Sequence, residues 1–164
     1  MTSDPLSELP ETLRSVNTAP LFVLRLAVRP IQMVGATPGG LRRVGIVYGG
    51  EFSGSRLAGE VLDGGSDWQT VQAQGTTMLD VRLLLRTTDG ELIGMAYRGI
   101  RHGPPDVLRR IDSGEAVDPA EYYFRINPQF ETASPRLAWL NRILSIGIGY
   151  RRADGPVYSI FEVR

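Results

Sequence analysis

Apolar and polar residues alternate along most of this chain, which is the pattern of β-strands that bury one face. The clearest alternation lies within residues 70–86, where one face carries Leu79, Val81, Leu83 and Leu85. Similar patterns predict further strands at residues 21–28, 42–48, 51–62, 91–100, 121–126, 144–151 and 157–163.

Turn sequences separate the predicted strands. Asp89-Gly90 is typical of a β-hairpin, and Asp154-Gly155 joins the last two strands in the same way. Residues 106–112 follow two prolines and favour a short helix, while residues 137–141 favour a helical turn. Strands at this spacing predict an all-β fold, either an antiparallel barrel or a sandwich.

The length of the chain suits one domain. Its 164 residues include 42% hydrophobic residues, which is enough for one substantial core. Residues 1–19 are mostly polar, so we expect a flexible N-terminal segment. Residues 20–164 then form the single β domain.

The charge composition argues against a nucleic-acid partner. The chain has 18 basic and 18 acidic residues and a formal net charge of zero, whereas nucleic-acid binders usually carry a basic excess. Arginine supplies the basic side chains, and its planar guanidinium suits paired binding to carboxylates.

Missing residue types narrow the chemistry further. The chain has no cysteine, which excludes disulfides, thiolate metal sites and cysteine nucleophiles. The single histidine, His102, lies in a predicted loop. One histidine argues against a histidine-rich zinc site and against a Ser-His-Asp catalytic triad. No glycine motif for a dinucleotide or a phosphate follows a strand, so we expect no cofactor and no metal.

Membrane and export signals are also missing from the sequence. No apolar run reaches the ~18 residues that a membrane-spanning helix requires. Residues 1–16 include three acidic residues and no apolar core of a signal peptide. We therefore expect a cytoplasmic protein with no membrane partner.

The first candidate site is Asp67 beside Trp68, at the end of the glycine-rich residues 49–68. Glycine at that density allows the backbone to bend sharply or to approach another group closely. A desolvated carboxyl beside an aromatic ring can act as a general acid or base. The alternative is a surface turn that Asp67 caps.

A second candidate is formed by Asp80 and Arg82, which share the polar face of their strand. If the apolar face of that strand packs on a partner, these charges point into the barrel and can hold a carbonyl or carboxylate group. Arg98 lies on the paired strand and can extend the cluster. The alternative is an ion pair on a solvated face.

Tyr123 and Arg125 form a third pair, two residues apart on one strand face. A phenol near a guanidinium can donate a hydrogen bond to a developing oxyanion. The alternative is a core tyrosine whose hydroxyl already has a hydrogen-bond partner. Trp139 and Asn141 can line the same pocket, or Trp139 packs in the core and Asn141 caps the backbone. Glu51 follows two glycines and faces either the cavity or the surface.

Six short motifs are spaced along the chain: Gly64-Gly65-Ser66-Asp67-Trp68, Leu79-Asp80-Val81-Arg82, Thr88-Asp89-Gly90, Tyr123-Phe124-Arg125, Phe130-Glu131-Thr132 and Trp139-Leu140-Asn141-Arg142. This series resembles domain-of-unknown-function family 3237. The resemblance covers about residues 20–164. It implies an antiparallel barrel of the allene-oxide-cyclase-like or lipocalin-like type, often a homodimer, and no settled activity. The enzyme that gives the fold its name rearranges an oxygenated lipid, and related barrels cyclise polyketides.

Three functions remain open from the sequence. The first is a cofactor-independent isomerase, cyclase or lyase that acts on a small oxygenated hydrophobic molecule. Its catalytic residues would be Asp67, Asp80, Arg82 and Tyr123, and its substrate-binding residues Glu51, Trp68, Arg98, Arg125, Trp139 and Asn141. The second is a carrier that binds such a ligand without chemistry, and the third is a structural barrel with a filled interior. A homodimer is expected if residues 79–85 turn their apolar face outward.

Overall fold

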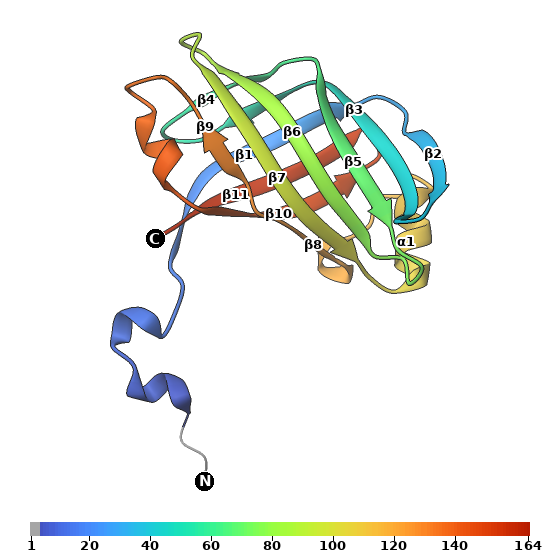
Figure 1. Cartoon of the computed structure of the whole chain (residues 1–164), viewed down its shortest axis with the longest axis horizontal. Helices are drawn as coiled ribbons and strands as arrows, with labels where there is room; N and C mark the ends of the chain where they lie inside the picture. Colours follow the sequence, from blue (N-terminus) through green and yellow to red (C-terminus); the bar gives the residue numbers. More distant parts are fainter. Residues whose placement is uncertain (1–3) are drawn as a thin grey trace.

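The computed structural model describes residues 4–164, and it shows a closed antiparallel β-barrel (Figure 1). The eight strands of the ring lie in the order β6-β5-β3-β1-β11-β10-β8-β7, and pairing of β6 with β7 closes it. Their bounds are β1 Thr18–Val28, β3 Gly40–Ser53, β5 Gly65–Val71, β6 Thr77–Thr87, β7 Leu92–His102, β8 Tyr123–Ile126, β10 Ser145–Arg152 and β11 Gly155–Val163.

Three short strands extend the ring. β2 (Gln32–Thr37) pairs with β3, β4 (Ala58–Val61) bridges β3 and β6, and β9 (Gln129–Glu131) pairs with β7. The α-helix α1 (Pro105–Asp112) lies at one end of the barrel (Figure 1). Single 3-10 turns are η1 Pro5–Glu8, η2 Glu11–Leu13, η3 Pro119–Glu121 and η4 Ala138–Arg142. The predicted barrel with one short helix is confirmed over the described residues.

No helix within residues 4–164 is both long and apolar enough to cross a membrane. Residues 1–3 of the expected N-terminal segment lie outside the described residues. Residues 4–17 form the two 3-10 turns and project away from the barrel (Figure 1), and β1 begins at Thr18 rather than Leu21.

The apolar face of β6 points into the barrel, which corrects the prediction that Asp80 and Arg82 point inward. Leu79, Val81, Leu83 and Leu85 are buried, whereas Asp80 and Arg82 are exposed on the outside. Closing the ring buries this apolar face within a single chain, so no partner is needed to cover it.

Two predicted strands are divided in the structure. Residues 51–62 split between the end of β3 and β4, because residues 54–57 turn the chain after Gly54. Residues 70–86 split between β5 and β6, joined by a turn in which Gly75 has a φ of +91°. That left-handed backbone favours glycine, so Gly75 marks the end of one strand and not its middle.

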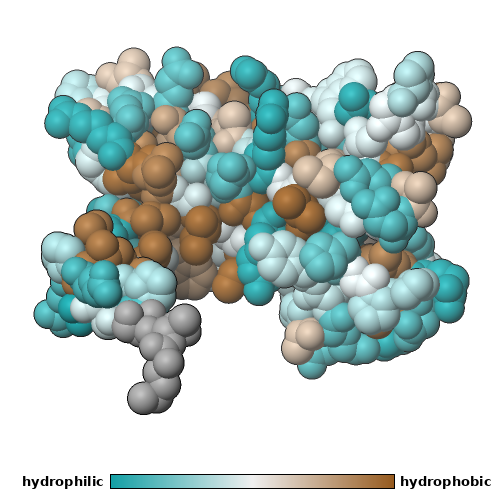
Figure 2. Space-filling model, turned by 60° about the horizontal axis from the view of Figure 1, so that its bottom comes forward, coloured by the Kyte–Doolittle hydropathy of each residue, from teal (hydrophilic) through white to brown (hydrophobic). Residues whose placement is uncertain are grey.

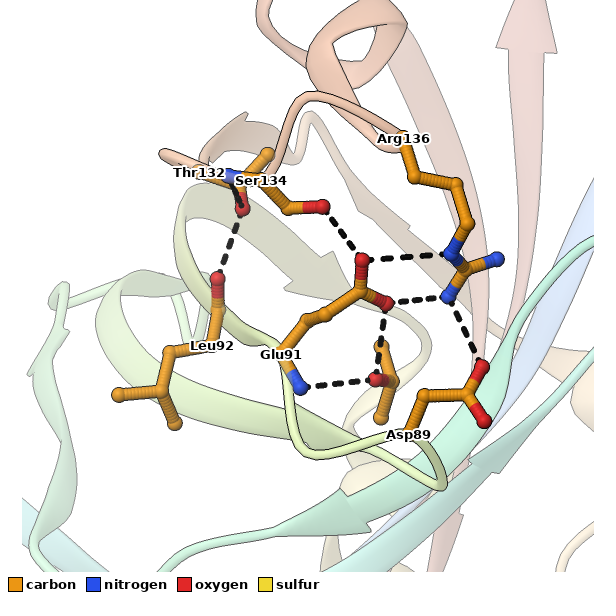
Figure 3. Close-up of polar contacts among 7 residues, drawn as sticks. Asp89, Glu91, Leu92, Thr132, Ser134 and Arg136 are labelled. Atoms are coloured by element: carbon orange, nitrogen blue, oxygen red, sulfur yellow. Dashed lines mark hydrogen bonds and ion pairs between the residues drawn. The ribbon is translucent and has the colours of Figure 1, made fainter.

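The β6–β7 hairpin is tied to the loop before η4 by Glu91 (Figure 3). Glu91 accepts hydrogen bonds from Ser134 and from Arg136, and Arg136 also pairs with Asp89 at 3.2 Å. These bonds lower the pKa of Glu91, with Arg136 as the largest cause. The cluster lies at the hairpin end of the barrel, away from α1.

An apolar band remains on the outside of the barrel. Figure 2 shows apolar side chains gathered on the face that its view brings forward. Leu144, Ile146 and Ile148, on and just before β10, are exposed by 62%, 44% and 42%. We call these three residues the β10 band.

Candidate functional site

A small polar cavity lies inside the α1 end of the barrel. Its enclosed volume is about 30 Å³. Its polar lining comes from β5, β7, β10 and β11 and consists of Asp67, Gln69, Tyr97, Arg101, Arg151 and Tyr158. A wider hollow of about 400 Å³ lies beside α1 and shares Gln69, Arg101 and Arg151 with this cavity. We call this hollow the mouth.

Asp67 reaches the cavity from β5, opposite Gly45 on β3. A side chain at Gly45 would place its Cβ 3.2 Å from Val28 and 3.3 Å from Ile31, so glycine keeps this wall of the cavity open. The Oδ2 atom of Asp67 accepts a 2.6 Å hydrogen bond from Nε2 of Gln69. Its Oδ1 atom is buried and has no hydrogen-bond partner.

The orientation of the Gln69 amide is set by Arg43. Nε of Arg43 donates to Oε1 of Gln69 at 2.7 Å. Because a guanidinium can only donate, the amide NH₂ group must face the carboxylate of Asp67. This chain of donors holds the Oδ2 atom of Asp67 in place, whereas its Oδ1 atom makes no hydrogen bond.

Burial raises the pKa of Asp67 from its ordinary value of 3.8 to about 6. The Gln69 hydrogen bond is the largest opposing influence, followed by the charge of Arg101. A carboxyl with a pKa near neutrality can both accept and return a proton at physiological pH.

Two buried tyrosines lie beside Asp67 in the cavity. The Tyr97 hydroxyl donates to the Tyr158 oxygen at 3.4 Å, and the two rings meet edge to face. Burial raises the pKa of both phenols, and the nearby charge of Asp67 raises it further. Both tyrosines therefore stay protonated, and the Tyr158 hydroxyl can donate to an oxygen in the cavity.

Phe124 supports this cluster from β8. Its ring packs edge to face on Tyr158, with centroids 5.3 Å apart, and the Arg101 guanidinium lies 5.7 Å from its centroid. Gly149 on β10 makes room for the ring, because a Cβ there would lie 2.4 Å from a Phe124 carbon. The packing fixes the positions of Tyr158 and Arg101.

Arg101 and Arg151 bring positive charge to the cavity. Arg101 is only 5% exposed, and its Nε atom has no hydrogen-bond partner. Burial lowers the pKa of both arginines, with a smaller contribution from the charge of Arg43. Among residues 4–164, no group of three or more histidine, aspartate or glutamate side chains is arranged to hold a metal ion.

A larger surface hollow of about 810 Å³ lies at the other end of the barrel, next to Glu91 and Thr132. It is open to solvent, and Glu91 is already bound to Arg136 and Ser134. Without a free buried polar group, this hollow is a weaker candidate than the cavity at Asp67.

Of the predicted catalytic residues, the structure brings only Asp67 into the cavity. Asp80, Arg82 and Tyr123 are exposed on the outer face, so these three predictions are corrected. Tyr123 stacks on His102 with ring centroids 4.9 Å apart, and Arg125 lies 4.9 Å from the Tyr123 ring centroid. The strand period explains the error, because these polar residues alternate with apolar ones that fill the barrel.

The predicted substrate-binding residues also lie outside the cavity. Arg98 and Arg125 are exposed on the outer faces of β7 and β8. Glu51 is exposed and pairs with Arg25 at 3.6 Å. Trp68 is 50% exposed, because it follows Asp67 on β5 and so points to the opposite face.

The last two predicted residues lie near the far end of the barrel. Trp139 packs against the core, and the Arg56 guanidinium lies 3.9 Å from its ring centroid. Asn141 caps the backbone: its Oδ1 accepts from the Thr132 amide at 2.8 Å, and its Nδ2 donates to the Thr132 carbonyl at 2.9 Å. The structure therefore bears out the alternatives of a packed tryptophan and a backbone cap.

Five residues of the cavity were missed by the sequence interpretation: Gln69, Tyr97, Arg101, Arg151 and Tyr158. A signal for three of them was present. Tyr97 and Arg101 continue the alternation that buries Ile93 and Met95 on β7, so polar groups on an apolar face marked the site. Gln69 likewise shares a face with Asp67.

Comparison with known proteins places the chain in a family. The model of the protein family of unknown function DUF3237 matches residues 16–163. The chain belongs to this family. The resemblance found in the sequence motifs is thereby confirmed.

Other members have similar sequences and structures. The chain is 33% identical to the UPF0311 protein RPA1785 of Rhodopseudomonas palustris, over 91% of this chain and 97% of that protein. The crystal structure of RPA1785, a conserved protein of unknown function, matches with a TM-score of 0.89 over 92% of this chain and 99% of that one. A β-barrel-like protein from Acinetobacter baumannii is 34% identical, with a TM-score of 0.82 over 96% of this chain and 99% of that one.

A more distant structure shares the fold alone. An enzyme from Penicillium herquei matches with a TM-score of 0.69 and 20% identity, over 91% of this chain and 95% of that chain.

Proposed function

We propose that this DUF3237 protein is a cofactor-independent enzyme that moves a proton on a small oxygenated molecule, with Asp67 as the acid–base residue. The observation that carries the proposal is the free Oδ1 atom of Asp67, which is buried in a cavity shared with two protonated tyrosines. A general base needs such a free lone pair, and a buried oxygen without a partner is uncommon in a purely structural role.

The proton transfer follows from the positions of these groups. The Asp67 carboxylate takes a proton from the carbon next to a substrate carbonyl. The C–H electron pair forms a carbon–carbon double bond, and the carbonyl electron pair moves to the oxygen. The Tyr158 hydroxyl, held by Tyr97 at 3.4 Å, donates a hydrogen bond to that enolate oxygen.

The second half of the reaction returns the proton. If the substrate has a carbon–carbon double bond between its β and γ carbons, the enolate is conjugated with it, and the protonated Asp67 gives the proton to the γ carbon. The double bond then lies between the α and β carbons, and the carbonyl re-forms, which yields an isomer of the substrate. Alternatively, the enolate carbon attacks an electrophilic carbon of the same molecule, and Asp67 protonates the oxygen or carbon that receives the electrons, which closes a ring. Both outcomes return Asp67 to its starting state, so an isomerase and a cyclase use the same residues.

The shape of the interior supports an enzyme over a filled structural barrel. Most of the barrel is packed with side chains such as Phe52, Leu85 and Ile160, but the end beneath α1 keeps a cavity that shares Gln69, Arg101 and Arg151 with the mouth. A purely structural barrel has no need for a buried carboxyl and two arginines there, since burying charge is unfavourable.

The test is exchange of hydrogen for deuterium next to a carbonyl, followed by NMR in D₂O. The probes are small ketones that include acetophenone and 4-acetylbenzoate. The wild-type protein should accelerate exchange of at least one probe, and Asp67→Asn should slow that exchange by about 100-fold or more. Asp80→Asn is the matched control, because Asp80 is exposed on the outside of β6.

Two results would contradict the proposal. Exchange that Asp67→Asn leaves unchanged would remove Asp67 from the reaction. A probe that binds saturably and is recovered without exchange after long incubation would favour the carrier instead.

A further inference from the structure

The mouth of the barrel holds more positive charge than its own carboxylates can neutralise. Arg43, Arg101 and Arg151 all line it, and none of the three makes an ion pair within 4.0 Å with any residue in the described range 4–164. Asp112, at the end of α1, is an exposed carboxylate at the rim. The pKa of Asp67 is about 6, so this carboxyl is fully ionised only at a pH well above that value.

The hydrogen-bonding capacity of the buried Arg101 guanidinium is not fully used. Its side chain is almost fully removed from water, yet its Nε donor has no partner. The guanidinium rests near the Phe124 ring, which stabilises a cation but accepts no conventional hydrogen bond from Nε. A buried donor without an acceptor is unfavourable, and a bound anion would satisfy it.

The surroundings of these arginines suit an organic acid. The planar guanidinium matches a carboxylate through two parallel hydrogen bonds. Ile31, Met33 and Ile111 line the same mouth and offer apolar contacts to the carbon skeleton. The mouth, at about 400 Å³, lies within the size range of small-molecule pockets, whereas the cavity behind it, at about 30 Å³, admits little more than one group.

We propose that the substrate is an organic carboxylate, held at the mouth by Arg101, Arg151 and Arg43, with its carbonyl group directed toward Asp67 and Tyr158. This proposal rests on the proposed function, whose site it shares, and adds the chemical class of the substrate. Arg101 and Arg151 line both the mouth and the cavity, so they bind the anion at the junction between the two.

The test is isothermal titration calorimetry at pH 7 with 4-acetylbenzoate and hexanoate, each compared with its uncharged amide, and with inorganic phosphate. At least one carboxylate should bind saturably, and its amide should bind at least ten times more weakly. Arg101→Gln and Arg151→Gln should each weaken carboxylate binding by at least tenfold. Arg98→Gln, on the outside of the same strand as Arg101, should leave binding unchanged.

Several outcomes would overturn this proposal: neither carboxylate binds, an amide binds as tightly as its acid, or phosphate alone binds. Carboxylate binding by both Arg101→Gln and Arg151→Gln that is as tight as that of the wild type would do the same. Arg151 is less buried than Arg101, so Arg151→Gln keeps the test valid if Arg101→Gln fails to fold.

Asp67→Asn separates this proposal from the proposed function. This variant should bind the carboxylate at least as tightly as the wild type, because it removes a negative charge from the cavity. If a carboxylate binds but no deuterium exchange depends on Asp67, the enzyme proposal is wrong and the proposal of an anion site still holds. If the protein catalyses exchange of acetophenone but binds no carboxylate, the enzyme proposal holds and the proposal of an anion site is wrong.

Discussion

Gln69 donates a 2.6 Å hydrogen bond to Asp67, two residues before it on the same face of β5. Arg43 holds the amide of Gln69 in the orientation that makes this bond possible. One face of a single strand therefore carries the carboxyl that is proposed to react and the group that positions it. The same hydrogen bond also controls how readily Asp67 loses its proton.

Removing this hydrogen bond should raise the pKa of Asp67 above its present value of about 6, because the Gln69 bond is the largest influence that lowers it. We expect Gln69→Leu to move the midpoint of the Asp67 titration upward, measured by carbon NMR of the carboxyl group. Gln74→Leu, at an exposed position in the β5–β6 turn, is the control and should leave the midpoint unchanged. An unchanged midpoint in Gln69→Leu would contradict the assigned role of Gln69.

The proposed reaction should depend on pH through Asp67. The base form of Asp67 predominates above its pKa of about 6, so the exchange rate at limiting substrate should rise from pH 5 to pH 7 and then level off. The measurement is deuterium exchange of a reactive ketone across this range. A rate that falls as the pH rises would show that Asp67 acts first as an acid.

Stability should depend on pH with the sign set by the same carboxyl. The folded pKa of about 6 lies above the ordinary 3.8, so between these values the folded protein holds a proton that the unfolded chain releases. Raising the pH through this window therefore lowers the free energy of unfolding.

Asp67→Asn removes this dependence. We expect its free energy of unfolding to exceed that of the wild type by up to about 3 kcal/mol above pH 7, with the difference vanishing below pH 4. Urea unfolding at several pH values measures this, and Asp80→Asn should show no such difference. Equal stability of Asp67→Asn and wild type at pH 8 would mean that burial of Asp67 has little energetic effect.

Tyr158→Phe should separate catalysis from folding. The variant keeps the ring packed against Phe124 but loses the hydroxyl that accepts from Tyr97 and faces Asp67. We expect a loss of about 1 kcal/mol in the free energy of unfolding and a fall of 10-fold or more in exchange rate. Tyr123→Phe, on the outer face, is the control, and a comparable loss of activity there would point away from the cavity.

The homodimer expected from the sequence stays a prediction, but the structure changes its interface. Leu79, Val81, Leu83 and Leu85 are buried within the chain, whereas the β10 band is exposed. In a two-fold dimer the same band on two copies would cover itself.

Light scattering at tens of micromolar should give twice the mass of the chain, and Ile146→Asp with Ile148→Asp should give the monomer. Leu84→Asp, at a similarly exposed apolar position on β6, should leave the dimer intact. A wild-type monomer at this concentration would rule the dimer out.

The amino-acid sequence by itself predicted the all-β class of the fold and most of the strands of the barrel. Alternation on β6 and β7, with the short Asp89-Gly90 turn between them, predicts an antiparallel hairpin, because parallel neighbours need a crossover connection of about a dozen residues or more. The sequence also singled out Asp67, since a carboxyl at the end of a glycine-rich segment stands out locally.

Only the tertiary structure decided which face of each strand is the inside. A period of two separates Asp80 and Arg82 from Leu79 and Val81 but assigns neither set to the interior. Closing the ring decides which face is the inside. Side chains from eight strands fill the interior and exclude nearly all water, so the apolar face of each strand turns inward.

The partners of Asp67 were beyond the sequence for a related reason. Tyr97, Arg101, Arg151 and Tyr158 lie 30 or more positions away along the chain and meet Asp67 only where β5, β7, β10 and β11 face one another across the barrel. No local pattern encodes such a meeting, since it depends on the strand order and register of the closed sheet. The sequence therefore predicted most of the strands and the candidate acid Asp67, whereas only the closed barrel brings the other residues of the site to Asp67.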